Sequence, residues 1–300
     1  MTQLTLALDI GGTKIAAGIV DADGTLIETR TLPTPPGDDP EQPWAVVATL
    51  VEQLRAEHPV GGAGIASAGP IHEPAGTVSP VNIAAWRNFP LRDRVAALLP
   101  GLPVRLAGDG VCMALGEHWR GAGQGAQSML GMVVSTGIGG GLVLGGTPYT
   151  GRTGNAGHVG HMVVQVDGPA CACGGRGCVE AIASGPRMAR WAREQGWDAP
   201  AGAGAKELGQ AAAAGDAVAL RAYRRSAEAL AAMIASVGAV CDLDLVVIGG
   251  GVAKSGDLLF GPVREALKTY AVLDFIAQLT VLPAALGGDA GLIGAAALLR

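Results

Sequence analysis

Residues 151–185, GRTGNAGHVGHMVVQVDGPACACGGRGCVEAIASG, gather three cysteines and two histidines into one stretch. Three of the five cysteines, Cys171, Cys173 and Cys178, lie within eight residues of one another, and His161 stands just upstream. Thiolate sulfur and imidazole nitrogen are the ligands that tetrahedral zinc prefers, and three sulfurs with one nitrogen complete a closed structural site. The stretch therefore predicts a zinc site made by these four side chains.

The alternatives to zinc are a disulfide and a cluster of inert cysteines. An odd number of cysteines and the lack of a secretory signal argue against disulfides. Zinc would also fix two polar neighbours, His158 and Glu180, in defined positions, so the loop could place binding residues as well as stabilise the fold.

Composition excludes several classes of protein. With 300 residues, 49% of them hydrophobic and 16% charged, the chain can form one large domain or two ordinary ones and is too apolar to be disordered. The net charge of −5, without a block of Lys or Arg, argues against nucleic acid as the main partner. No apolar run is long enough for a membrane helix, and MTQLTLALDIGG lacks a signal-peptide pattern, so we expect a cytoplasmic protein.

Two segments with the same organisation predict phosphate-binding turns. Residues 4–20, LTLALDIGGTKIAAGIV, and residues 132–146, MVVSTGIGGGLVLGG, each place a glycine-containing turn between two apolar runs. Backbone N–H groups of such turns can converge on phosphate oxygens, and an ordinary hairpin is the alternative. Two matched turns favour a clamp on a phosphate chain, formed by Asp9, Gly11, Gly12, Thr13 and Lys14 in the first and Thr136, Gly137, Gly139, Gly140 and Gly141 in the second.

An aspartate stands where a strand gives way to a helix in residues 104–121, VRLAGDGVCMALGEHWRG. Ligands of α/β sheets bind at the carboxyl ends of strands, so Asp109, in the predicted turn at 108–110, is a candidate general base. The alternative is an N-cap for the helix, and the residues alone favour that alternative.

The run GNAGHVGH followed by CACGGRGCVEAIASG resembles the signature of the ROK family, which comprises repressors, open reading frames and sugar kinases. DIGGTK at residues 9–14 resembles the first phosphate motif of the sugar kinase, actin and Hsp70 superfamily. The resemblance extends over essentially the whole chain through at least five motifs in order. It implies a two-lobed α/β fold, the actin-like ATPase (ribonuclease H-like) fold with a zinc-binding loop. The smaller lobe would comprise residues 1–107 and 288–300, and the larger lobe residues 108–287.

The same resemblance assigns roles within an ATP- and Mg²⁺-dependent sugar kinase. Asp109 becomes the catalytic base, and the glycines of DLVVIGGGVAKSG (residues 244–256), Gly249, Gly250 and Gly251, join the phosphate turns in binding ATP. The implied sugar contacts are Gly69, Asn82, His158, His161 and Glu180. The family usually has Asn before the catalytic aspartate, whereas this chain has Gly108. A homodimer is the implied assembly.

The expected substrate is inferred from the residue at position 158. ROK glucokinases normally have Glu at this position, whereas AGHVGH and GCVEAIASG resemble the bacterial N-acetylmannosamine kinases more closely. The resemblance implies 6-phosphorylation of N-acetyl-D-mannosamine in sialic acid catabolism, with the imidazole donating to the N-acetyl carbonyl. Rival hypotheses are a kinase for glucose or another hexose and a non-catalytic sugar sensor. A repressor would need a helix-turn-helix domain, for which the position of Asp9 leaves no room.

Overall fold

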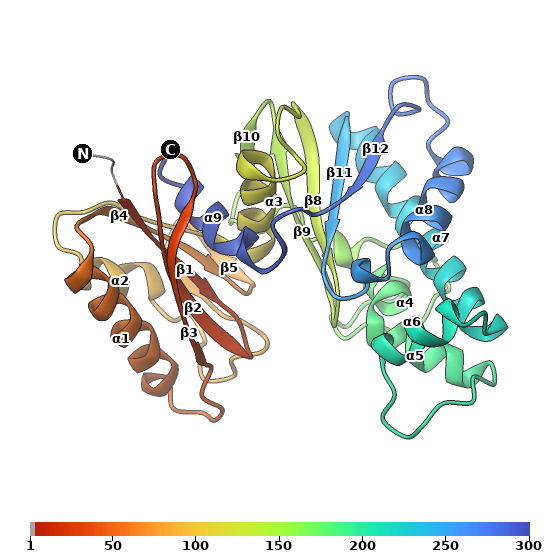
Figure 1. The fold of residues 1–300 in the computed structure, drawn as a ribbon, viewed down its shortest axis with the longest axis horizontal. Coiled ribbons are helices and arrows are strands. Elements are labelled where there is room, and N and C mark those ends of the chain that lie inside the picture. The colour runs from red at the N-terminus through yellow and green to blue at the C-terminus, as the bar shows by residue number, and fades with distance from the viewer. Residues whose placement is uncertain (1–3) are drawn as a thin grey trace.

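The computed structural model describes residues 4–300 as two lobes, each built on a five-stranded mixed sheet (Figure 1). The first sheet has the order β3-β2-β1-β4-β7. Its strands are β1 (Leu4–Ile10), β2 (Lys14–Val20), β3 (Leu26–Pro33), β4 (Val60–Ser67) and β7 (Val104–Gly108). The second has the order β10-β9-β8-β11-β12, with β8 (Ser128–Val134), β9 (Ile138–Leu144), β10 (Thr147–Tyr149), β11 (Leu245–Gly249) and β12 (Thr280–Pro283). A small sheet pairs β5 (Ile71–His72) with β6 (Thr77–Val78).

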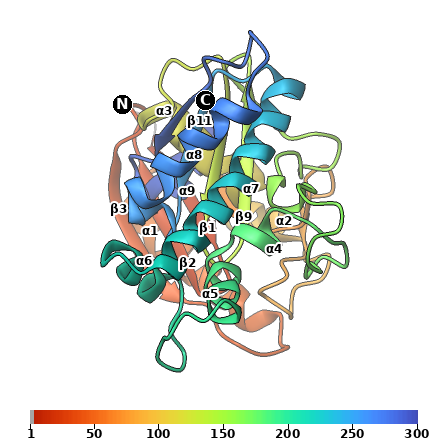
Figure 2. The same ribbon diagram turned by 90° about the vertical axis from the view of Figure 1, so that its right-hand side faces the viewer.

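Helices cover both sheets and separate them. α1 (Glu41–Glu57) and α2 (Leu91–Leu98) share an apolar core with the first sheet, and α3 (Asp109–Arg120) and α9 (Ala290–Ala297) pack between the two sheets. The outer face of the second sheet is covered by the other helices (Figure 2). These are α4 (Glu180–Ala183), α5 (Gly185–Glu194), α6 (Ala205–Ala213), α7 (Ala217–Cys241) and α8 (Asp257–Tyr270). Short 3₁₀ turns lie at Val159–His161 and Ala253–Ser255, and a third, Gly287–Asp289, leads into α9. Among residues 4–300, no helix combines the length and apolar character needed to cross a bilayer.

Both predicted hairpins are present, and the actin-like fold is confirmed. β1 pairs antiparallel with β2, and β8 pairs antiparallel with β9, so each lobe begins with the same strand–turn–strand unit. The closing helix α9 packs back on the first lobe as expected. Gly64 of β4 has to be glycine for this packing, because a Cβ there would lie 1.8 Å from the carbonyl oxygen of Ala295.

The two acidic site residues come together because of parallel pairing. β1, β4 and β7 run parallel, with Ser67 beside Gly108 at their carboxyl ends. Asp9 lies near the end of β1, and Asp109 follows β7 directly. Helix α3 begins at Asp109 itself and Gly108 is the N-cap residue, so the turn expected at 108–110 is absorbed into the helix start and Asp109 is not the cap.

One buried carboxylate ties together the two places where the chain passes between the lobes. The first passage is α3, and the second is the segment between β12 and α9. Glu117 of α3 is completely buried and accepts hydrogen bonds from the backbone N–H groups of Ala285 at 3.0 Å, Leu286 at 2.8 Å and Ala122 at 2.9 Å. Three backbone donors therefore depend on one buried side chain.

Replacing Glu117 by Gln is expected to lower the free energy of unfolding by about 1–3 kcal/mol, because the buried amide NH₂ would face backbone N–H groups and leave at least one donor unsatisfied. Urea unfolding of the two proteins measures this difference. Glu194→Gln, at an exposed position on α5, is the matched control. An unchanged unfolding free energy in Glu117→Gln would contradict the role of the carboxylate.

Candidate active site and metal centre

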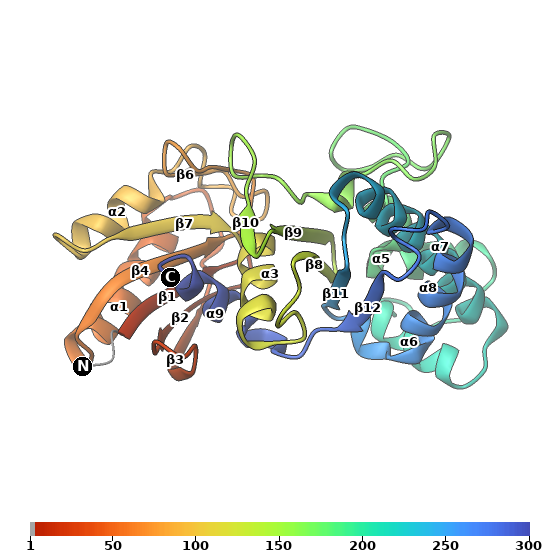
Figure 3. The same cartoon turned by 90° about the horizontal axis from the view of Figure 1, so that it is seen from above.

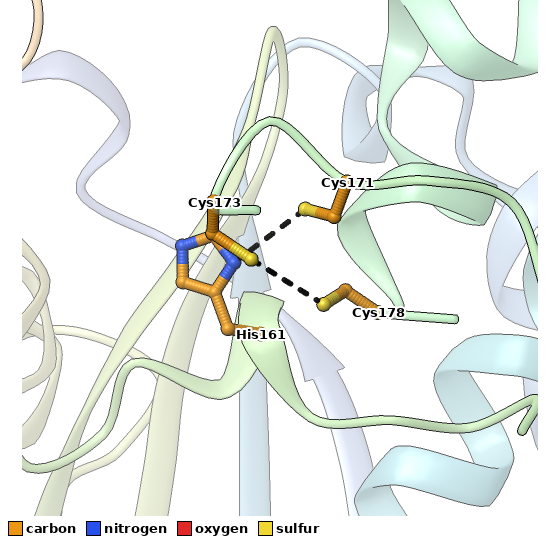
Figure 4. A group of neighbouring side chains, drawn as sticks. All are labelled: His161, Cys171, Cys173 and Cys178. Carbon is orange, nitrogen blue, oxygen red and sulfur yellow. Dashed lines mark hydrogen bonds between the residues drawn. The ribbon is translucent and has the colours of Figure 1, made fainter. Parts of the chain in front are cut away.

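The four predicted metal ligands converge on one point (Figure 4). Their ligand atoms all lie within 4.8 Å of one another, with Cys173 Sγ 3.8 Å from Cys178 Sγ and Cys171 Sγ 3.8 Å from His161 Nδ1. Tetrahedral zinc with Zn–S bonds of about 2.3 Å holds its sulfur ligands about 3.8 Å apart. The cysteines are free rather than disulfide-bonded. The donor set and its spacing therefore fit zinc.

The metal-binding loop has only a small apolar cluster of its own. The loop, green in Figure 3, extends away from the second sheet. The apolar cluster beneath it consists only of Cys171, Cys178 and Ala181. A structural metal would supply the cohesion that a larger apolar core gives elsewhere in the chain.

The loop also places two predicted sugar ligands. His161 turns Nδ1 toward Cys171, which leaves its other ring nitrogen free to face a substrate. Glu180 follows Cys178 and begins α4, and its Oε2 accepts the backbone N–H of Ile138 at 2.8 Å. Since Ile138 lies at the turn between β8 and β9, Glu180 connects the metal loop to the second predicted phosphate turn.

Asn155, which the sequence analysis did not single out, fixes the position of His158. The Asn155 side chain accepts the N–H of Ile71 at 3.0 Å and donates to the carbonyl oxygen of Ile71 at 2.7 Å, joining residues 150–158 to the first lobe. His158 Nδ1 donates to the carbonyl oxygen of Asn155 at 3.1 Å. The His158 ring then lies beside Gly69, 3.5 Å from where a Cβ of that glycine would be.

The hydrogen bond to Asn155 changes the chemistry expected of His158. Because a carbonyl oxygen only accepts, Nδ1 carries the proton, and Nε2 of the neutral ring is an acceptor. The ring would therefore receive a hydrogen bond from a substrate N–H or O–H. Donation to an acetyl carbonyl, as the sequence analysis expected, would need the protonated ring.

The first phosphate turn is braced from the side and contacts Asn82. Thr34 Oγ1 donates to the carbonyl oxygen of Gly11 at 2.6 Å, and the N–H of Thr34 donates to the carbonyl oxygen of Thr13 at 3.0 Å. A Cβ on Gly12 would lie 2.5 Å from the Asn82 side chain, so glycine makes room for this close approach. Thr13 and Lys14 are exposed at the same turn.

The second phosphate turn lies against the predicted adenosine turn. The carbonyl oxygen of Val134 accepts the N–H of Val252 at 3.0 Å, and Gly250, at φ +96°, would place a Cβ 2.4 Å from that oxygen. Thr136 and Gly251 line a cavity of about 830 Å³, together with Ser135, Gly185, Pro186, Tyr223, Lys206 and Lys254. The cavity has the size of a site for a small organic ligand.

Packing supplies a second reason for two of the predicted phosphate glycines, Gly140 and Gly141, which lie with Gly139 inside β9. A Cβ on Gly139 would meet nothing within 4 Å. A Cβ on Gly141 would lie 2.4 Å from Cα of Val111, and one on Gly110 would lie 2.4 Å from the carbonyl oxygen of Gly140. The N-terminus of α3 therefore approaches β9 at backbone distance. Phosphate contact by these glycines remains a prediction.

Asp9 and Asp109 interact electrostatically at the carboxyl ends of their strands. Burial, with the neighbouring Asp109 charge, raises the pKa of Asp9 to about 6 despite the opposing charge of Lys14. Desolvation by the surrounding protein also raises the pKa of Asp109, although the side chain remains open to solvent on one side. The Gly110 N–H, at 2.7 Å from Oδ1, and His158 oppose that rise. A pair of crowded carboxylates is a natural place for a divalent cation or a proton acceptor.

Asp9→Asn is expected to stabilise the metal-free, nucleotide-free protein by about 1–2 kcal/mol at pH 8, because the ionised, desolvated carboxylate is removed. Because folding raises the pKa of Asp9, its ionised carboxylate destabilises the folded protein. This destabilisation is complete above pH 6 and disappears as the pH falls toward the unfolded pKa near 4. The gain should therefore shrink between pH 8 and pH 4.5 in urea unfolding. Asp38→Asn, at an exposed loop position, is the control. Equal gains at both pH values would contradict the assignment.

Comparison with known proteins finds similarity over essentially the whole length of the chain. A family model described as "ROK family" matches residues 5–300. A glucokinase of Streptomyces coelicolor is 35% identical over 312 residues, which cover 99% of this chain and 98% of that protein. An N-acetylmannosamine kinase of Citrobacter koseri is 40% identical over 295 residues, covering 98% of each. A crystal structure of a ROK family glucokinase from Streptomyces griseus in complex with glucose and AMPPNP superimposes with a TM-score of 0.83 at 35% identity, covering 98% of both chains.

Proposed function

We propose a substrate and a mechanism for this chain, which belongs to the ROK family and is an ATP-dependent sugar kinase. The substrate is N-acetyl-D-mannosamine, phosphorylated at its 6-hydroxyl in the cytoplasm. The supporting observation is the position of His158, which lies beside Gly69 and near Asp109 and is fixed through Asn155. Glucokinases and N-acetylmannosamine kinases are similarly related to the chain, so the choice of sugar rests on this local chemistry.

His158 suits an acetamido group better than a carboxylate would. Its Nε2 is a neutral acceptor that can take the amide N–H of the substrate. A glutamate at this position would instead add a negative charge near Asp109. The imidazole therefore accepts the 2-substituent without adding to the repulsion that already raises the pKa of Asp9.

Neither the backbone conformation nor the packing requires glycine at position 108. Its φ of −65° and ψ of 149° suit any residue, and a Cβ there would meet only the carbonyl oxygen of Gly154, at 4.0 Å. A glycine without a backbone reason, next to the proposed base, widens the site at this point. We attribute that width to the bulk of the acetamido substituent.

Asp109 would accept the proton of the sugar 6-hydroxyl as that oxygen attacks the γ-phosphate. ATP supplies the phosphoryl group, and Mg²⁺, near Asp9, would neutralise its charge. The two glycine turns would direct backbone N–H groups at the phosphate oxygens, where charge develops during transfer. Closure of the lobes would exclude water and limit wasteful hydrolysis.

The test is ATP consumption with N-acetylmannosamine, glucose, N-acetylglucosamine and mannose, each with and without Mg²⁺. We expect kcat/KM to be highest for N-acetylmannosamine. In His158→Glu, which introduces the residue that ROK glucokinases normally carry, the N-acetylmannosamine to glucose ratio of kcat/KM should fall at least about tenfold, or about 1.4 kcal/mol. His72→Glu makes the same exchange at an exposed position and should leave the ratio unchanged.

Other outcomes separate the rival functions. Glucose in the lead with wild-type protein would make the chain a glucokinase, and an unchanged ratio in His158→Glu would remove the role of that residue. Gly108→Asn, which the geometry accommodates, should lower KM for glucose relative to N-acetylmannosamine. No turnover with any sugar would favour a sensor that has lost catalysis.

A further inference from the structure

A second cavity lies outside the proposed sugar and ATP sites. It has a volume of about 380 Å³ and is formed by the metal-binding loop, α4, α5 and α7. Residues 169–172 of the loop make one wall, and Ala181, next to Glu180, contributes to another. The residues proposed to touch sugar or phosphate do not line it. Cys171, a predicted zinc ligand, is the point of contact with the metal centre.

The cavity is rich in arginine. Helix α5 presents Arg187, Arg190, Trp191 and Glu194 at spacings of three, four and seven residues, which is one helical face, and α7 adds Arg225. Glu194 is the one carboxylate among the lining residues, and its Oε1 is paired with Nε of Arg190 at 2.9 Å. Within residues 4–300, neither Arg187 nor Arg225 forms a salt bridge of its own.

Arg225 is held in place without a direct salt bridge, and the charge of Glu194 acts on it only from a greater distance. Its Nη1 donates to the carbonyl oxygen of Ile182 at 3.2 Å, and its guanidinium lies 5.3 Å from the centre of the Trp191 ring. The half-buried position lowers the pKa of Arg225, because desolvation disfavours the charged form. A guanidinium stays charged in proteins, so an anion entering the cavity would compensate for solvent that folding has removed.

We propose that this cavity binds the phosphomonoester of a sugar phosphate, with Arg187 and Arg225 donating to the phosphate oxygens. Guanidinium groups match phosphate oxygens in charge and fork geometry. Trp191 and the loop backbone then offer an apolar surface and polar groups for the sugar ring. The choice of a sugar phosphate rests on the proposed kinase function, because that class contains the product. The anion site itself rests only on the arginines and the cavity.

Isothermal titration of the full-length zinc-loaded protein, saturated with sugar and the non-hydrolysable analogue AMPPNP, tests the proposal. The active site is then occupied, so N-acetylmannosamine 6-phosphate or glucose 6-phosphate should report the second site. We expect one equivalent to bind, and Arg187→Gln and Arg225→Gln each to weaken binding at least about tenfold, the loss of a charge-assisted hydrogen bond. Arg224→Gln, the neighbouring α7 residue that lines a different surface, should bind normally.

Each contrary result has a separate meaning. Absence of binding, or binding unaffected in both arginine variants, would overturn the site. Inorganic phosphate binding as tightly as the sugar phosphates would overturn the sugar part of the proposal. Thermal melts and unchanged turnover would show that the variants are folded. If no sugar is a substrate, the phosphate titration still tests the arginine site, so the two proposals fail separately.

Discussion

Asp109→Asn is expected to lower kcat about a thousandfold, within the range that a positioned general base contributes. The carboxylate follows β7, starts α3 and lies near Asp9 at the edge where parallel strands end. Asn is almost isosteric with Asp, and its carbonyl oxygen can still accept the Gly110 N–H. Geometry is therefore preserved while the ability to accept a proton is lost. Steady-state kinetics should show the change in kcat with KM for the sugar altered less than about threefold.

The pH profile distinguishes a base from a residue that only orients the sugar. Because burial raises the pKa of Asp109, the protonated and inactive form persists to higher pH than for an ordinary carboxyl. Wild-type kcat/KM should fall as the pH drops through that raised value, and the residual activity of Asp109→Asn should lack this acidic limb. Turnover retained within tenfold, or an unchanged acidic limb, would contradict the assignment.

The two lobes could be predicted because their signals are local. The strand–turn–strand units at residues 4–20 and 132–146 and the four metal ligands all show in short windows of sequence. The structure also shows why two site residues far apart in the sequence lie close together. Asp9 and Asp109 are a hundred residues apart, yet parallel pairing of β1, β4 and β7 brings both to one edge, as the strand-end rule anticipates.

What the sequence did not disclose depends on partners distant in the chain. Glu117 reads as an ordinary helix residue until Ala285 and Leu286 are seen to donate to it. Asn155 is one polar residue in a loop, and its importance comes from Ile71, 84 positions away. The glycines of β9 resemble a phosphate loop in sequence, whereas the structure also packs two of them, Gly140 and Gly141, on the start of α3. A side chain's residue type does not reveal which backbone groups will face it after folding.

Removal of zinc is expected to raise KM for the sugar at least about tenfold, because His161 and Glu180 would lose their fixed positions, and such supporting contacts are typically worth 10–100-fold. Cys178→Ala should have the same effect, since Cys178 is a buried member of the cluster. AMPPNP affinity should change less, because the metal loop does not line the 830 Å³ cavity. Metal analysis should give one zinc per wild-type chain and less in the variant.

Hydrogen exchange can separate loss of the metal from general unfolding. With only Cys171, Cys178 and Ala181 packed beneath it, the loop should exchange rapidly over residues 158–180 in the metal-free protein, while β8 and β11 stay protected. Cys241→Ala, at a cysteine outside the cluster, should keep zinc, protection and KM unchanged. Returning zinc to the chelated wild type should restore sugar binding, because the ligand set survives chelation. A metal-free protein with full activity would show that the loop orders itself without zinc, and the link between the cysteines and the sugar site would then be lost.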